Sequence, residues 1–477
     1  SREGQVLFVH LQELQDLMHR QKRFSEALAM AAQIQKESQR LAGNQQLSLE
    51  ANRRIYVTCK TKLEAAGVPT EGKLDYNESG VHLNLYSRPV KDLSILRGVP
   101  LTSLTFRFEN NIDLSPLQGM PLRHLFIAGD SRDPNKIIEL TALKDSPLTS
   151  LRIHMVAVAD LSPLRGMALT NLDLYETFVS DLSPLQGMKL VSFSINSCPV
   201  ADIHVLRGMP LRSVVIFQRS GEGRIADLSA LEGMHLNLLH ISSVPVRNLD
   251  FLTNMPLTVL SLSRVPVSDL TFLKSLPLTD LSIEAMPPID LSALTALKLR
   301  YLKISETKFT NFALLKGMPL AQLRLDRSFI DDISFLKGMR LAELSLNNTR
   351  IADLSPLEGM PLTSLHIQGT PIRNLEPLRG MLLTYLDAQG ADIDDISVLR
   401  GMPLGVLRLS GCKNLRDLTP LADCLQLGQL TIPEHCQEID FLRRLPILKS
   451  LNRNDDASAK TAAEFWREYD AAKNKKD

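Results

Sequence analysis

The sequence lacks an excess of charge of either sign. Its 54 Lys and Arg residues nearly balance 53 Asp and Glu residues, which gives a net charge of +1 at pH 7. A protein built to bind nucleic acid or anionic lipid carries a strong local or overall positive excess. The composition therefore argues against a dedicated nucleic-acid binder, and we expect no nucleic acid among the partners.

Long apolar runs are also missing. No segment approaches the roughly 18 consecutive apolar residues of a membrane-spanning helix, and no signal-peptide pattern opens the sequence. We expect no membrane insertion by this chain. Its start at Ser1 rather than at Met is compatible with a fragment of a longer product.

Aromatic residues and cysteines are scarce. Phe, Trp and Tyr together make up 5% of the chain, with a single Trp, so the core must be aliphatic. Five cysteines are too few for a disulfide framework. Cys198 and Cys412 are expected to be buried thiols, whereas a disulfide between Cys424 and Cys436 stays open as an alternative.

The sequence offers no catalytic signature. It contains no Walker loop, no Gly-x-Ser-x-Gly elbow and no His-Glu-x-x-His motif, and its ten histidines do not cluster into a zinc set. We therefore predict no enzymatic activity, no cofactor and no metal. An enzyme whose site is dispersed along the chain stays open as an alternative.

One short unit repeats through most of the chain. It is clear in residues 353–367, Asp-Leu-Ser-Pro-Leu-Glu-Gly-Met-Pro-Leu-Thr-Ser-Leu-His-Ile, and the apolar residue after its Asp anchors each copy. Thirteen of the 16 intervals between the 17 anchors are 21 residues, and the others are 26, 25 and 22. The anchors are Leu93, Leu114, Leu140, Leu161, Leu182, Ile203, Leu228, Leu249, Leu270, Leu291, Phe312, Ile333, Leu354, Leu375, Ile396, Leu418 and Ile439.

Each unit predicts one strand and one turn. The ending Leu-x-x-Leu-x-Leu/Ile, as at Leu341, Leu344 and Leu346, alternates in the manner of a strand with one buried face. The Asp-Leu-Ser-Pro-Leu stretch favours a tight turn because proline lacks a backbone donor. Since 21 residues are too few for a strand and a full α-helix, we predict a solenoid with a parallel sheet on its concave face and 3₁₀ turns on its convex side.

These units resemble leucine-rich repeats, which share the strand-forming Leu-x-x-Leu-x-Leu and unit lengths of 20 to 29 residues. The Asp-Leu-Ser-Pro-Leu half is similar to the internalin-type bacterial subclass, one residue shorter per coil. That family often has Asn after the strand. Here Thr177, Thr307, Thr349 and Thr370, together with Cys198 and Cys412, stand at that place, and the resemblance implies a stacked ladder of side-chain hydrogen bonds to the loop backbone.

The two ends predict helical caps. Residues 1–70 hold apolar residues at helical spacing and are expected to form a tetratricopeptide-like hairpin or cap, with a link to a missing neighbour as the alternative role. Residues 71–452 form the solenoid of about 17 coils. In residues 453–477, Thr461 and Glu464 predict a capping box, and Phe465, Trp466 and Tyr469 favour sealing of the last coil over grip on a partner.

The outward positions of the strands are the candidate binding surface. Their charged members number five basic and six acidic residues, Arg107, Arg152, Lys303, Arg324 and Arg408 against Asp173, Asp280, Glu284, Asp326, Glu343 and Asp387. Aromatic and arginine side chains are the usual anchors of protein interfaces. The predicted partner-binding residues of the concave face are Phe126, Arg152, Tyr175, Phe217, Tyr301, Arg324 and Tyr385.

Two insertions add a candidate basic edge. Extra residues fall between Gly129 and Asn135 and between Gln218 and Arg224, just after a strand in each case. Binding residues often lie on such loops, although insertions that are neutral for function explain the extra residues equally well. The predicted edge residues are Arg132, Lys136, Arg219 and Arg224.

We therefore expect a non-catalytic protein-binding module that engages a protein partner through its concave face and edge loops. The Gly-Met-Pro-Leu-Thr-Ser-Leu coils and the stretch Ala463 to Tyr469, Ala-Glu-Phe-Trp-Arg-Glu-Tyr, resemble the leucine-rich arms that follow a serine/threonine kinase domain and a membrane anchor in some bacteria. That resemblance implies a sensor or scaffold arm on the extracytoplasmic side of the envelope. The alternative is a secreted or surface adhesin of internalin type.

Overall fold

The computed structural model describes residues 45–65, 67–68, 70–130, 138–219, 225–288, 290–309, 311–453 and 460–473. The chain divides into two compact units. Unit 1 holds residues 1–236 and 243–246, and unit 2 holds residues 237–242 and 247–477. Most of the predicted N-terminal element of residues 1–70 lies outside the described residues.

Unit 1 begins with helix α3 (Gln45–Ala65) and continues as a sheet on a series of short 3₁₀ turns. Strand β1 pairs antiparallel with β2, and β2 to β8 follow one another in parallel. The strands are β1 (Leu74–Asn77), β2 (Gly80–Leu85), β3 (Ser103–Arg107), β4 (His124–Ala128), β5 (Ser150–His154), β6 (Asn171–Tyr175), β7 (Ser192–Asn196) and β8 (Ser213–Phe217). The turns are η1 (Ser94–Leu96), η2 (Ser115–Leu117), η3 (Thr141–Leu143), η4 (Ser162–Leu164), η5 (Ser183–Leu185), η6 (His204–Leu206) and η7 (Ser229–Leu231).

Unit 2 repeats the same coil in parallel from β9 to β19 and ends with helix α4 (Ala462–Lys473). Its strands are β9 (Leu238–Ser242), β10 (Val259–Ser263), β11 (Asp280–Glu284), β12 (Tyr301–Ser305), β13 (Gln322–Arg324), β14 (Glu343–Ser345), β15 (Ser364–His366), β16 (Tyr385–Asp387), β17 (Val406–Arg408), β18 (Gln429–Thr431) and β19 (Ser450–Asn452). Its turns are η8 (Asp250–Leu252), η9 (Thr271–Ser275), η10 (Ser292–Ala296), η11 (Phe312–Leu315), η12 (Ser334–Leu336), η13 (Ser355–Leu357), η14 (Glu376–Leu378), η15 (Ser397–Leu399), η16 (Thr419–Asp423) and η17 (Asp440–Arg444).

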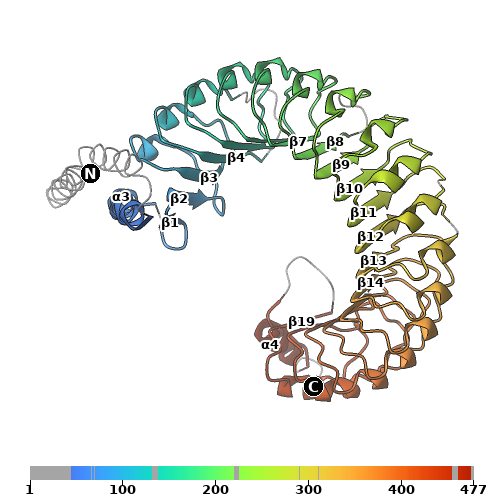
Figure 1. Ribbon diagram of the computed structural model, residues 1–477. Coiled ribbons are helices and arrows are strands. Elements are labelled where there is room, and N and C mark those ends of the chain that lie inside the picture. The colour runs from blue at the N-terminus through green and yellow to red at the C-terminus, as the bar shows by residue number, and fades with distance from the viewer. Residues whose placement is uncertain are drawn as a thin grey trace. The chain divides into compact units, whose positions relative to one another are not determined.

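The repeat register makes this a leucine-rich repeat solenoid with 3₁₀ turns, as the sequence predicts. Leu323, Leu344 and Leu365 occupy the same position on neighbouring strands and are fully buried. Within each unit the strands line one side of the coils and the 3₁₀ turns line the other (Figure 1). Burial of equivalent aliphatic side chains in every coil supplies the continuous core that a single coil could not form.

The turns of most coils are held by their own side chains. In the coil of η13, the backbone N–H of Ser355 donates to Asp353 at 2.8 Å and the Ser355 hydroxyl donates to the other carboxylate oxygen at 2.7 Å. Asp145 and Asn254 hold positive φ after η3 and η8, but in most coils the residue that closes the turn is a glycine. In the coil of η5 it is Gly187, whose φ of +78° is a conformation that residues with a Cβ rarely adopt.

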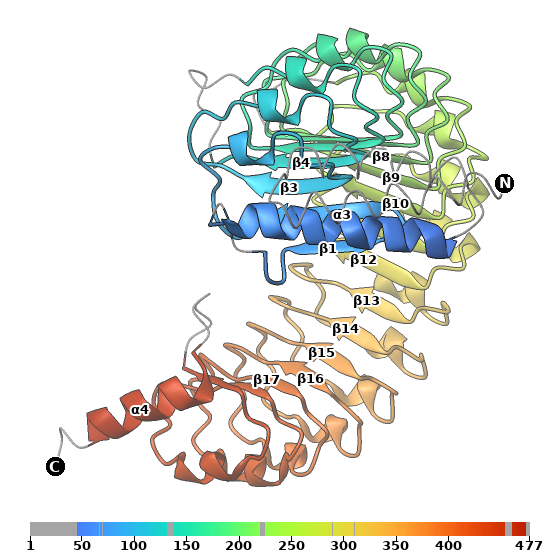
Figure 2. The same ribbon diagram turned by 90° about the vertical axis from the view of Figure 1, so that its left-hand side faces the viewer.

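Both described helices cover an end of the sheet (Figure 2). Helix α3 packs on β1 and β2 through Ile55, Cys59 and Leu63, which are fully buried, and Gly67 closes its last turn at φ +76°. Helix α4 packs on β19.

The predicted sealing helix is confirmed. Glu464 accepts the Thr461 backbone N–H at 2.9 Å, and Thr461 accepts the Glu464 N–H at 3.3 Å, which is the capping box. Phe465 is buried, the Arg443 guanidinium lies 4.1 Å from the centre of the Trp466 ring, and the Tyr469 hydroxyl donates to the Gln437 carbonyl at 2.6 Å. These aromatic side chains therefore face the last coils.

The coil interior decides one open alternative and bears out one expectation in part. All five cysteines are free and buried, so Cys424 and Cys436 form no disulfide. The expected ladder is formed in part. The Thr177 hydroxyl lies 3.1 Å from the Cys198 sulfur of the next coil, and Cys198 and Cys412 donate to the carbonyls of Leu174 and Ala388 in the preceding coil, at 3.6 and 3.0 Å. Two other Thr hydroxyls bond within their own coil. Those of Thr349 and Thr370 donate to the carbonyl three residues earlier in their own turn, both at 2.7 Å, and the buried Thr307 hydroxyl has no hydrogen-bond partner among the described residues.

Candidate functional site

Five outward side chains of unit 1 make one continuous surface, here called the aromatic cluster: Tyr86, Phe126, Arg152, His154 and Tyr175. Their ring centres follow one another at 5.6 Å from Tyr86 to Phe126, 4.7 Å from Phe126 to His154 and 5.3 Å from His154 to Tyr175. The Arg152 guanidinium lies 4.8 Å from the centre of the Phe126 ring. Phe126, Arg152 and Tyr175, predicted separately, are thus brought together through His154.

Asp173 fixes the polar members of the aromatic cluster. It accepts a hydrogen bond from Arg152 Nε at 3.2 Å and lies 2.9 Å from His154 Nε2. Burial raises the pKa of Asp173, but the hydrogen bonds from His154 and Ser194 outweigh it and leave the pKa below its usual value. Asp173 is therefore an anion at neutral pH that orients both neighbours.

Arg219 is tied to the neighbouring surface. Its guanidinium lies 2.9 Å from the carboxylate of Glu176, the residue after Tyr175. Burial and this carboxylate raise the pKa of the Tyr175 phenol, which stays neutral as a donor. Phe217, at the end of β8, makes no ring contact with the cluster among the described residues. The other predicted edge residues, Arg132, Lys136 and Arg224, lie outside the described residues.

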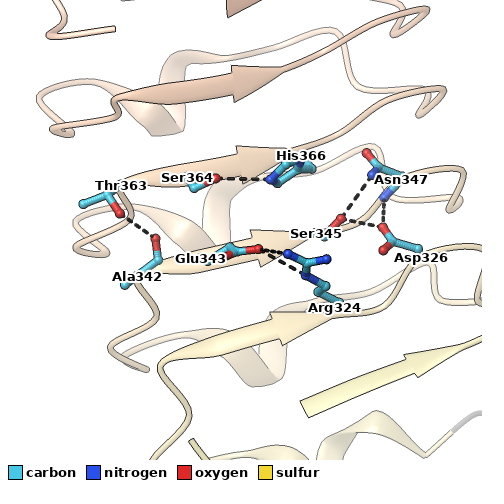
Figure 3. Close-up of polar contacts among 9 residues, drawn as sticks. All are labelled: Arg324, Asp326, Ala342, Glu343, Ser345, Asn347, Thr363, Ser364 and His366. Atoms are coloured by element: carbon cyan, nitrogen blue, oxygen red, sulfur yellow. Dashed lines mark hydrogen bonds and ion pairs between the residues drawn. The ribbon is translucent and has the colours of Figure 1, made fainter. Parts of the chain in front are cut away.

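In unit 2 the outward basic residues also pair with carboxylates of the adjacent strand. Arg324 donates from Nε at 3.1 Å and from a terminal nitrogen at 2.5 Å to one Glu343 oxygen (Figure 3). Lys303 pairs in the same way with Glu284. These pairs fix side chains that would otherwise be free to rotate.

Tyr385 has the same neighbours as Phe126 has in unit 1, a histidine and an arginine. Its ring centre is 4.7 Å from that of His366 and 5.9 Å from the Arg408 guanidinium, which lies 3.8 Å from Asp387. Tyr301, the remaining predicted residue, pairs in register with Gln322 of β13, and its charge interaction contributes to the raised pKa of Arg324.

Side chains also link successive coils at the ends of the strands in unit 2. Asp326 accepts hydrogen bonds from the Ser345 hydroxyl at 2.5 Å and from the Asn347 backbone N–H at 2.9 Å (Figure 3). Asn347 in turn accepts from the backbone N–H of Gln368 at 2.8 Å. This ladder holds the strand ends of three coils at a fixed spacing.

Within the described ranges, no group of three or more His, Cys, Asp and Glu side chains is placed to hold a metal ion. Burial lowers the pKa of His240 and of His366, so both are neutral near pH 7. No helix in the described part of the chain has the length and apolar character needed to cross a membrane.

Sequence reasoning missed Tyr86, His154 and His366 as site residues. Tyr86 and His154 stand one residue after the last apolar residue of their strand, and His366 stands between Leu365 and Ile367. These are the outward positions from which Phe126 and Tyr175 were selected. The repeat register therefore already marked these three residues as outward-facing, but the histidines were considered only as metal ligands.

Comparisons with known proteins report distant likenesses. No protein-family model matches the chain, and no curated protein matches it. Among solved structures, an internalin (InlF) of Listeria monocytogenes is 21% identical with a TM-score of 0.39, covering 66% of this chain and 83% of its own. The functional domain of InlJ from the same species is 16% identical with a TM-score of 0.43, covering 71% and 75%.

The leucine-rich ectodomain of the plant receptor kinase GASSHO1/SCHENGEN3 from Arabidopsis thaliana, solved in complex with Casparian strip integrity factor 2, is 15% identical with a TM-score of 0.42. The match covers 78% of this chain and 50% of the plant ectodomain. The repeat geometry described above carries the fold assignment on its own.

Proposed function

We propose that this chain is a protein-binding module that engages its partner through the outward face of its strands. The observation that carries the proposal is the aromatic cluster, in which rings and a guanidinium from neighbouring coils are fixed against one another before any partner arrives. Aromatic and arginine side chains dominate the energetics of protein interfaces. Fixing them beforehand lowers the entropy that binding must overcome.

Partner-dependent crosslinking tests this proposal. A photoreactive phenylalanine analogue placed at Tyr175 or Phe217 in unit 1, or at Tyr301 in unit 2, should crosslink one and the same protein in the native cell. The matched controls carry it at the exposed turn positions Gln186 and Lys337. The same band from the turn positions, with none from the strand positions, would place recognition on the opposite side.

A second measurement uses the partner once it is identified. Alanine at Tyr175, Phe217 and Tyr301 should weaken its binding by roughly tenfold or more, because buried aromatic anchors contribute about 2 kcal/mol or more each. The thermal unfolding midpoint should stay unchanged, since these side chains face away from the core. Unchanged binding would shift the proposal to Arg132, Lys136, Arg219 and Arg224 of the edge loops.

The finer proposal is that this module is the sensor or scaffold arm of a membrane-anchored bacterial kinase, on the extracytoplasmic side. The resemblance of its Gly-Met-Pro-Leu-Thr-Ser-Leu coils and of residues 463–469 to such arms supports it. Sequencing the native gene upstream of Ser1 tests it. A kinase domain and a membrane-spanning segment are expected, whereas a cleavable signal peptide alone would favour the secreted adhesin.

A further inference from the structure

Four ion pairs, three on the strand face and that of Arg219 and Glu176 at its edge, turn their arginine outward and their carboxylate inward. The exposed side-chain fractions are 52% for Arg152 against 25% for Asp173 and 57% for Arg219 against 10% for Glu176. In unit 2 they are 42% for Arg324 against 18% for Glu343, and 38% for Arg408 against 8% for Asp387. An approaching partner therefore meets guanidinium groups first, although the face as a whole is close to neutral.

The asymmetry recurs just after the strands of unit 2, where the exposed fractions are 67% for Arg327 and 53% for Arg264 against 31% for Glu306. It does not hold for every pair. The pair of Arg107 and Asp130 is exposed to 32% and 35%, and that of Lys303 and Glu284 to 28% and 25%. Pairing alone therefore does not turn the cation outward. In the four pairs the carboxylate is the more deeply buried partner, exposed to between 8% and 25%.

We propose that the strand face recognises acidic segments of a partner protein, with the outward N–H groups of these arginines receiving the partner's carboxylates. This inference rests on the proposed function and names the chemistry of the partner. A guanidinium presents five N–H donors in a flat fork that matches a carboxylate. The recessed Asp173 holds Nε of Arg152, and Glu343 holds Nε and one terminal nitrogen of Arg324, which leaves the remaining donors of these two arginines for a partner.

Arg152 shows the geometry most fully. Its Nε donates to Asp173 at 3.2 Å, and among the described residues this is the only hydrogen bond of its side chain. The Phe126 ring lies beneath the guanidinium, with its centre 4.8 Å away. Both contacts restrict the rotamers of Arg152 in the unbound protein, so a partner carboxylate would find the fork already oriented.

The same combination occurs independently in unit 2. The Arg408 guanidinium lies 5.9 Å from the centre of the Tyr385 ring and 3.8 Å from Asp387. In both units an exposed guanidinium thus lies beside an aromatic ring. A matching partner segment combines a carboxylate for the guanidinium with an apolar side chain for the neighbouring ring.

A polyanion fits this face poorly. The affinity of nucleic acid grows with the number of counterions that basic side chains release from the phosphates. Here each outward arginine has a carboxylate at 2.5 to 3.8 Å that offsets its field at long range. A partner carboxylate, which approaches to hydrogen-bond distance, is attracted by the near guanidinium more than it is repelled by the recessed anion.

Selection of a random peptide display library on the full chain tests the inference. The selected peptides are synthesised with a fluorescent label and titrated by anisotropy. We expect them to be enriched in Asp and Glu relative to the starting library. Arg152→Met and Arg324→Met, which keep the apolar stem but remove the charge, should each weaken peptides that bind at their unit by roughly tenfold.

The controls separate charge from fold. Arg165→Met and Lys337→Met remove one exposed positive charge each from the turn side and should change affinity by less than about twofold. Arg152→Lys, which keeps the charge but loses the fork, should fall between Met and wild type. Unchanged melting temperatures confirm that the variants are folded.

Several results would overturn the inference. The inference is wrong if the selection yields no peptides, or only neutral or basic ones. It is also wrong if the turn-side controls lose as much affinity as the strand-face variants, or if oligothymidylate displaces the peptides. If the selected peptides are neutral and Phe126→Ala abolishes their binding, the preference for acidic segments is wrong, but the proposed binding function is supported. Peptides indifferent to every strand-face variant would contradict both.

Discussion

At the scale of single residues, the position after each strand shows how this chain accommodates an unfavourable backbone. Glu176, Ala285, Glu306 and Arg327 have φ between 49° and 53°, whereas Gly369 occupies the equivalent place nearer the C-terminus at φ 65°. A residue with a Cβ costs roughly 1 to 2 kcal/mol in this region. The hydrogen bonds of the neighbouring coils must therefore hold these residues in place.

This strain predicts opposite effects for two small substitutions. Ala285→Gly should stabilise the protein by about 0.5 kcal/mol, because relief of the strain exceeds the extra entropy of glycine in the unfolded chain. Gly187→Ala should destabilise it by roughly 1 to 2 kcal/mol, although an added Cβ has no atom within 4 Å, since φ there is +78°. Chemical denaturation of both variants measures the effects. Two changes of the same sign would contradict the assignment of strain to φ.

At the scale of the structural element, the turn is the part of the coil that responds to pH. Asp290, Asp332 and Asp353 each accept the backbone N–H and the hydroxyl of the Ser two residues later, at 2.7 to 2.8 Å. These hydrogen bonds to Ser lower the pKa of all three carboxyl groups. In another coil, Asn374 makes the equivalent bond to the Glu376 N–H at 2.8 Å with an amide oxygen that does not titrate.

The turns therefore predict a loss of stability in acid. A carboxyl group with a lowered folded pKa stabilises the protein above its unfolded pKa, about 3.9 for Asp, and the contribution is lost as the pH falls through the folded value. The triple variant Asp290→Asn, Asp332→Asn and Asp353→Asn keeps the backbone acceptor and should show a shallower fall in melting temperature below about pH 4 than the wild type. Identical slopes for the two proteins would contradict this origin of acid sensitivity.

The element is also the scale at which the sequence was most informative. Leu-x-x-Leu-x-Leu fixes which side chains point outward, so Phe126, Arg152 and Tyr175 could be selected without a structure. The repeat pattern could not predict that the His154 ring lies between those of Phe126 and Tyr175, or that the side chain of Arg152 is more exposed than that of Asp173. Those features depend on how far each side chain reaches across neighbouring strands. The expected ladder is formed only in part for a related reason. The short hydroxyl of Thr349 donates to the carbonyl of its own turn, whereas that of Thr177 lies 3.1 Å from the Cys198 sulfur of the next coil.

At the scale of the whole molecule, the repeat makes stability a local quantity. Each coil of a solenoid contacts chiefly the coils before and after it, so the free energy of unfolding is approximately a sum over coils and the interfaces between them. In unit 2, β14 pairs with β13 and β15. A binding face built from several coils can therefore lose one part while distant parts keep their structure.

Leu344→Ala tests this locality. Leu344 is fully buried in the coil of β14, and truncation should destabilise that coil by about 2 to 5 kcal/mol through lost burial and the cavity left behind. Hydrogen exchange read by mass spectrometry should then accelerate in β13, β14 and β15 and stay near the wild-type rate in β9 and β10. The exposed Lys337→Ala in the preceding turn serves as the matched control. Uniform acceleration from β9 to β19 would show instead that unit 2 opens as one cooperative body, and a partner bound at any coil would then stabilise all of them equally.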